Sequence, residues 1–133
     1  MNDRAFFDTN VLLYLLSADN VKAACAEALL AKNGVISVQV LNEFAAIARR
    51  KSKMTYADIR NTLHIIRAVC SVQPLTVDTH ESGLDIAERY GFSFYDSVII
   101  AAALQANCRL LYSEDLQHGQ EIQGRLTIVN PFV

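Results

Sequence analysis

The stretch RAFFDTNVLLYLL at residues 4–16 decides the fold. Residues 4–8 form a short apolar segment that ends in an acid, as is typical of a buried strand. Asn10 to Leu16 predicts a short helix directly after it. Strands that alternate with helices form a parallel sheet through right-handed crossovers. We therefore expect Asp8 to lie at the carboxyl end of a buried parallel strand.

The rest of the chain alternates in the same way, without repeats or linkers. Further strands are predicted at residues 35–37, 74–77, 109–112 and 126–129, and further helices at residues 21–32, 38–51, 55–70, 78–90 and 96–106. The last of these helices is apolar on nearly every side, which predicts a buried helix. We expect one α/β domain over residues 1–133, with a central, mostly parallel five-stranded sheet and helices on both faces.

Local signals mark where these helices begin and end. Ser37 is a candidate N-cap, and Thr55 with Asp58 resembles a capping box. Asp78 with Glu81 is a second cap signal, for the helix that Gly91 ends. Asn33-Gly34 predicts the usual glycine ending for the helix over residues 21–32.

Composition places the chain among globular proteins. Of the 133 residues, 52% are hydrophobic, and the longest apolar run, Val98 to Leu104, is far short of the ~20 residues that cross a bilayer. The N-terminus lacks the pattern of a signal peptide. Cys25, Cys70 and Cys108 are widely spaced and are interpreted as buried hydrophobes. These features predict a cytoplasmic location and no membrane partner.

Four acids are expected to meet at one edge of the sheet: Asp8, Glu43, Asp96 and Asp115. Each follows a strand or lies near the start of a helix, and ligands of parallel sheets bind at the carboxyl ends of strands. At ~5 Å and an effective dielectric of ~20, each pair of carboxylates repels by about 3 kcal/mol. Bound Mg²⁺ or Mn²⁺ would relieve that repulsion, whereas a structural Zn²⁺ would need grouped Cys or His.

A metal site of this kind supports phosphoryl chemistry. One ion lowers the pKa of a bound water, and a second, ~4 Å away, stabilises the leaving oxygen. The net charge of −2 argues against a nucleic-acid partner, but neutralising the four acids leaves +2. Arg50 lies seven residues after Glu43 on the same helix face, so it is a candidate phosphate ligand or, alternatively, a helix-end side chain.

At these residues the chain resembles the PIN-domain ribonucleases, most closely the VapC-type toxins of toxin–antitoxin pairs. The matching motifs are FFDTNVLLYLL around Asp8, SVQVLNEF around Glu43, FYDSVIIAAAL around Asp96 and YSEDLQHG around Asp115, with the ending NPF. The resemblance extends from residue 5 almost to the C-terminus, although residues 51–77 carry no shared motif.

The resemblance implies a Mg²⁺- or Mn²⁺-dependent endoribonuclease. Its metal ligands would be Asp8, Glu43, Asp96 and Asp115, with Asn10 and Ser113 as polar residues that orient the site. Glu114 stays open as an alternative fourth ligand. The resemblance also implies RNA as substrate, a homodimer and a cognate antitoxin. The apolar segments 11–16 and 21–30 leave surface for such partners.

Three other functions remain as alternatives. The first is a PIN nuclease that acts in RNA processing or decay without an antitoxin. A phosphatase of the Asp-x-Asp type is disfavoured because Asn10 occupies the second acidic position. A non-catalytic binding module would have no reason to keep four acids at one edge.

Overall fold

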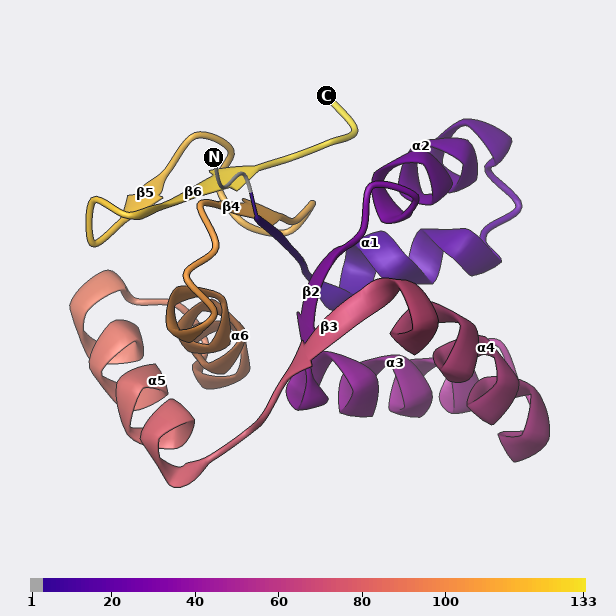
Figure 1. Cartoon of the computed structure of the whole chain (residues 1–133), viewed down its shortest axis with the longest axis horizontal. Coiled ribbons are helices and arrows are strands. Elements are labelled where there is room, and N and C mark those ends of the chain that lie inside the picture. The colour runs from indigo at the N-terminus through magenta and orange to yellow at the C-terminus, as the bar shows by residue number, and fades with distance from the viewer. Residues whose placement is uncertain (1–3) are drawn as a thin grey trace.

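The structure is a computed structural model that describes residues 4–133. Within these residues the centre is a six-stranded sheet with the strand order β3-β2-β1-β4-β6-β5 (Figure 1). The neighbours in this order are parallel, except β5 and β6, which are antiparallel. The strands are β1 (Ala5–Phe7), β2 (Gly34–Ser37), β3 (Cys70–Gln73), β4 (Leu110–Tyr112), β5 (Glu121–Ile122) and β6 (Leu126–Val129).

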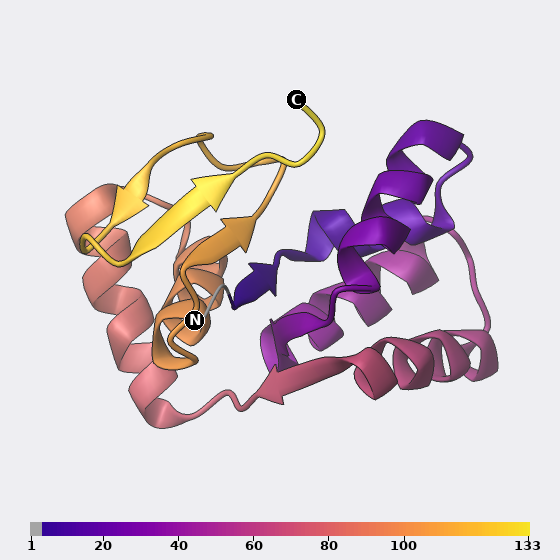
Figure 2. The same ribbon diagram turned by 45° about the horizontal axis from the view of Figure 1, so that its top comes forward.

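Helices lie on both sides of this sheet. Figures 1 and 2 show α5 and α6 side by side on one side and the helices α1 to α4 on the other. The helices are α1 (Thr9–Leu13), the 3₁₀ turn η1 (Tyr14–Leu16), α2 (Asn20–Leu30), α3 (Val38–Arg50), α4 (Tyr56–Val69), α5 (Val77–Tyr90) and α6 (Phe94–Gln105). The predicted α/β fold with a mostly parallel sheet is confirmed. Among the described helices, none is long and apolar enough to cross a membrane.

Helix α6 and strand β1 form much of the core. Every residue from Ser97 to Leu104 is buried, so the prediction of a buried helix is confirmed. Phe6 and Phe7 of β1 are also buried, because β1 has a paired strand on each side. Both elements are therefore rigid supports for side chains at their ends.

Two predictions about the sheet need correction, the position of one strand and the number of strands. The third strand lies at Cys70–Gln73, where it pairs with β2, and not at residues 74–77. Pro74 cannot donate to a ladder, and the following residues lead into α5. The sheet also has six strands and not five, because β5 pairs with β6 across a turn in which Gln123 and Gly124 have positive φ.

The helix-end signals had mixed outcomes. Ser37 and Thr55 cap α3 and α4 as predicted, and Gly91 ends α5 in the left-handed conformation. The cap signal at residues 78–81 was wrong, since Thr76 caps α5.

The predicted glycine ending of α2 was also wrong. Asn33 takes the positive φ, and Gly34 begins β2. A Cβ atom at Gly34 would lie 2.5 Å from the Phe7 ring, so this glycine permits close packing of β2 on β1.

Candidate metal centre

The four predicted acids lie at the carboxyl edge of the sheet. Asp8 directly follows β1, and Asp115 follows β4 by three residues. Glu43 is in the second turn of α3, and Asp96 is in the first turn of α6, where Ser93 and not Asp96 is the N-cap. Strand order reverses between β1 and β4, which is where ligands of parallel sheets bind.

Asp8 is the buried member of the group, with 3% of its surface exposed. Its Oδ1 accepts from the Thr9 amide at 2.7 Å, and its Oδ2 accepts from the Ser113 hydroxyl at 2.8 Å. Burial raises its pKa from the ordinary value of 3.8 to about 7. The two hydrogen bonds oppose this rise, whereas the negative charges of Asp96 and Glu43 add to it. Those two carboxylates are therefore close enough to act on Asp8.

Glu43 is held by two side chains that the sequence did not single out. The Thr9 hydroxyl donates to Oε1 at 2.8 Å, and the Gln39 amide donates to Oε2 at 3.1 Å. Gln39 lies one helical turn before Glu43, which is a signal that sequence alone could have given. The contact from Thr9 joins segments 34 residues apart, and no local pattern indicates it.

Asn10 and Ser113 connect Asp8 with Asp115. The Asn10 amide nitrogen donates to Asp8 Oδ2 at 3.2 Å and to Asp115 Oδ2 at 3.1 Å. The Ser113 hydroxyl, which donates to Asp8, accepts from the Asp115 backbone amide at 3.2 Å. The two residues that the resemblance suggested as orienting groups thus contact two of the four acids.

Glu114 belongs to a different cluster. Its carboxylate accepts from Lys22 Nζ at 2.7 Å and from the Tyr14 hydroxyl, and these two bonds hold its pKa below the ordinary value. Lys22 also lies over the rings of Tyr14 and Phe132, 4.7 and 5.4 Å from their centroids. The loop after β4 is therefore fastened to α2 through Glu114, while the neighbouring Asp115 contacts Asn10.

The structure does not bring Arg50 to this group. It is exposed in the last turn of α3, seven residues after Glu43, and this spacing corresponds to about 10 Å along the helix axis. Arg49, Lys51 and Lys53 are exposed beside it. Arg50 could contact a phosphate only at some distance from the acids.

The donor chemistry fits a hard divalent cation. In residues 4–133, no three acidic, His or Cys side chains come close enough to hold one ion in this arrangement. Carboxylate oxygens are nevertheless the ligands that Mg²⁺ and Mn²⁺ prefer. A cation would also offset the cost of ionising a buried Asp8 beside Asp96 and Glu43.

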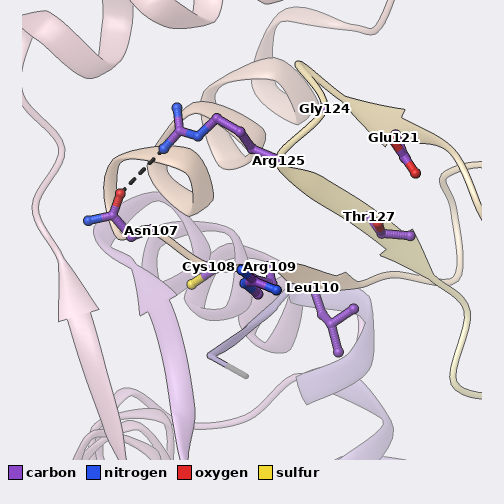
Figure 3. Close-up of a pocket in the computed structure, with 8 residues that line it drawn as sticks. All are labelled: Asn107, Cys108, Arg109, Leu110, Glu121, Gly124, Arg125 and Thr127. Carbon is purple, nitrogen blue, oxygen red and sulfur yellow. Dashed lines mark hydrogen bonds between the residues drawn. The ribbon is translucent and has the colours of Figure 1, made fainter. Parts of the chain in front are cut away.

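A separate hollow lies at the amino-terminal edge of the parallel strands, opposite the acids. Its volume is about 560 Å³, and it is lined by residues 107–110, which lead into β4, and by residues of β5, β6 and the turn between them (Figure 3). Arg125 donates to Asn107 across this hollow at 3.3 Å. None of the four acids lines it, so this hollow is not part of the candidate metal centre.

The fold and the site define a parallel α/β domain with an acidic cluster where strand order reverses. The family model for the PIN domain matches residues 5–120, and the chain belongs to the PIN-domain family. The predicted resemblance is thereby confirmed. A comparison with curated protein sequences gives no match.

Solved structures of toxins have the same fold. A toxin–antitoxin complex from Klebsiella pneumoniae is 22% identical with a TM-score of 0.72, and the match covers 96% of this chain and 97% of that one. The sarcin-ricin-loop-cleaving toxin VapC20 of Mycobacterium tuberculosis is 21% identical with a TM-score of 0.69, over 84% and 89% of the chains. VapBC2 of Rickettsia felis, bound to a promoter DNA fragment, is 17% identical with a TM-score of 0.65, over 93% and 96%.

Proposed function

We propose that this chain is a metal-dependent endoribonuclease and the toxin of a type II toxin–antitoxin pair. The observation that carries the proposal is the buried Asp8, which lies among Glu43, Asp96 and the Asn10–Asp115 contact at the carboxyl edge of the sheet. Membership of the PIN family supports nuclease activity. The toxin role draws on the solved toxins of the same fold.

Asp8, Glu43, Asp96 and Asp115 would hold Mg²⁺ or Mn²⁺. When bound, the cation makes water a stronger nucleophile and stabilises negative charge on the phosphodiester oxygens. The roles of the protein follow from its contacts: Ser113 and Asn10 orient Asp8 and Asp115, and Thr9 and Gln39 orient Glu43. Partner groups of this kind typically change metal affinity by about 10–100-fold when they are removed.

We assign the fourth ligand position to Asp115 and not to Glu114. Glu114 Oε1 accepts a hydrogen bond from the Tyr14 hydroxyl and Oε2 accepts one from Lys22 Nζ, so neither oxygen needs a cation to stabilise its charge. Asp115 is exposed and shares the Asn10 amide with Asp8. Glu114 is thereby an anchor for the loop that carries Asp115.

RNA and protein partners belong to the same proposal. The exposed basic residues at the end of α3, with Arg50 among them, would attract phosphates beyond the metal centre. Leu16 and Val21 are 37% and 81% exposed, and they leave apolar surface on η1 and α2 for an antitoxin or a second copy of the chain. A homodimer remains a prediction of the resemblance, and a cytoplasmic location remains a prediction of the sequence.

A cleavage assay tests the proposal. We expect the purified chain to cut single-stranded RNA with Mn²⁺ or Mg²⁺ and to stop with EDTA. Asp8→Asn and Asp96→Asn should abolish cutting while the protein stays folded. Glu121→Gln, at an exposed acid on the hollow at the opposite edge, is the matched control that should retain activity. Cleavage by the pure protein in EDTA, or normal turnover by either Asp variant, would contradict the metal-dependent assignment.

The toxin role needs a separate experiment. Induction in cells should arrest growth and produce RNA ends that are missing when Asp8→Asn is induced. A PIN nuclease of RNA processing is the alternative function. It would give the same metal dependence in vitro, but growth would continue without a partner protein.

A further inference from the structure

A small aromatic hollow adjoins the acidic group on the side of β3. Its volume is about 150 Å³, and it opens between the residues that follow β3 and the starts of α3, α5 and α6. The residues that line it include Gln39, Leu75, Thr76, His80, Phe94 and Tyr95. We call it the Tyr95 pocket.

The Tyr95 pocket lies next to the acids, although none of them lines it. Tyr95 directly precedes Asp96 in the first turn of α6. Gln39, which lines the pocket, donates to Glu43 Oε2 at 3.1 Å. An RNA phosphate at the acids would therefore place a neighbouring nucleotide at the mouth of this pocket.

The pocket offers ring faces to solvent. Tyr95 is 62% exposed although it is a large aromatic residue, and Leu75 beside it is 40% exposed. The Phe94 ring packs edge-on against His80 with the centroids 5.5 Å apart, and its centroid is 5.6 Å from that of Tyr95. Rings held in this way present a preformed surface on which a planar group can stack.

The lining suits a ring face and not a polar base edge. Leu75, Phe94 and Tyr95 supply apolar walls. Gln39 Nε2 is bonded to Glu43, and Thr76 Oγ1 is bonded to Thr79. Unpaired bases of RNA bind by stacking on aromatic side chains, and this stacking tolerates any base. A hollow of about 150 Å³ has the volume of about five waters, which suits a single planar ring.

We propose that the Tyr95 pocket binds one unpaired nucleobase of the RNA whose phosphate lies at the acidic group. This inference rests on the proposed nuclease function and adds a determinant of substrate choice to it. The pocket selects single-stranded over paired RNA, because a base within a duplex cannot leave its stack without a cost.

The test measures binding and cleavage separately. The probe is a labelled single-stranded RNA that the wild-type chain cuts or, if it cuts none, a mixed-sequence RNA of the same length. Binding is measured in the Asp8→Asn background, so that no cleavage interferes. Tyr95→Ala should raise the Kd by about 5- to 150-fold, the range for the loss of one base–aromatic stack. Tyr95→Phe, which keeps the ring, should bind like its parent.

Ile65→Ala is the control for loss of an exposed apolar side chain, because Ile65 is 68% exposed on α4 and does not line the pocket. An abasic substitution at one RNA position should weaken binding to the parent and leave binding to Tyr95→Ala unchanged. An unaltered Kd for Tyr95→Ala would overturn the pocket assignment. A change from dimer to monomer in that variant, with RNA affinity restored at high protein concentration, would overturn it in favour of a subunit interface.

The two proposals fail in different ways. If the native chain cuts no RNA with Mn²⁺, the nuclease function fails, whatever Tyr95→Ala does to binding. If the native chain cuts RNA and Tyr95→Ala cuts and binds equally well, only the pocket assignment fails.

Discussion

Replacing Asp8 with asparagine perturbs the charge at the centre of the site and keeps the shape of the side chain. In the metal-free protein the Asp8 carboxyl is buried and its pKa is raised from 3.8 to about 7. A folded-state pKa above the unfolded value means that the unfolded chain loses this proton first as the pH rises. The wild-type free energy of unfolding should therefore fall between about pH 4 and about pH 7 through this group.

The magnitude follows from the shift. One pKa unit corresponds to about 1.4 kcal/mol, so a shift of about three units makes the ionised Asp8 cost about 4 kcal/mol above pH 7. Asparagine never ionises, but its amide meets the donors of Ser113 and Asn10, and this mismatch costs about 1–3 kcal/mol at every pH. Asp8→Asn should be the less stable protein near pH 4 and the more stable one near pH 8.

The assay is urea unfolding of both proteins in EDTA across this pH range. The difference in free energy of unfolding between the two proteins should change by about 4 kcal/mol from about pH 4 to about pH 8. The hydrogen-bond mismatch is the same at every pH and does not contribute to this change. Asp115→Asn, at an exposed carboxyl, is the control and should stay within about 0.5 kcal/mol of wild type. A constant difference between Asp8→Asn and wild type would refute the claim that Asp8 is a costly buried charge.

Manganese should reverse this cost. At about one hundred times its Kd, a ligand that binds only the folded state adds about 2.7 kcal/mol of stability. Wild type at about pH 8 should gain this amount with Mn²⁺, and Asp8→Asn should gain much less. Equal stabilisation of both proteins would place the cation elsewhere.

Three further predictions concern the metal site and the packing around it. Lys22→Met releases the Glu114 anchor and should weaken Mn²⁺ binding by about tenfold in calorimetry, while the fold is kept; unchanged affinity would show that the anchor does not position Asp115. Asp115→Asn should lose far more metal affinity than Glu114→Gln, and the reverse order would exchange their roles. Gly34→Ala forces a Cβ against Phe7 and should cost about 1–3 kcal/mol in urea unfolding, whereas wild-type stability would mean that the ring moves aside.

The sequence predicted the parts of this protein that depend on local signals. Three kinds of local signal are found in the structure: the apolar segment before Asp8, the caps at Ser37 and Thr55, and the apolar run of α6. Each depends only on residues that are neighbours in the chain. The position of β3 was wrong because Cys70–Gln73 becomes a strand through its ladder with β2. Strand propensity reflects such pairing more than the residues themselves.

The sequence also placed Asp8, Glu43, Asp96 and Asp115 at one edge, since the carboxyl ends of parallel strands meet there. Only the tertiary structure decided how the acids are held. The contacts of Thr9 with Glu43 and of Lys22 with Glu114 join segments 34 and 92 residues apart. The ionisation of Asp8 depends likewise on its burial and on charges from other elements. Periodicity and capping report a residue's neighbours in the chain, whereas these contacts and charges exist only after the strands have brought distant segments together.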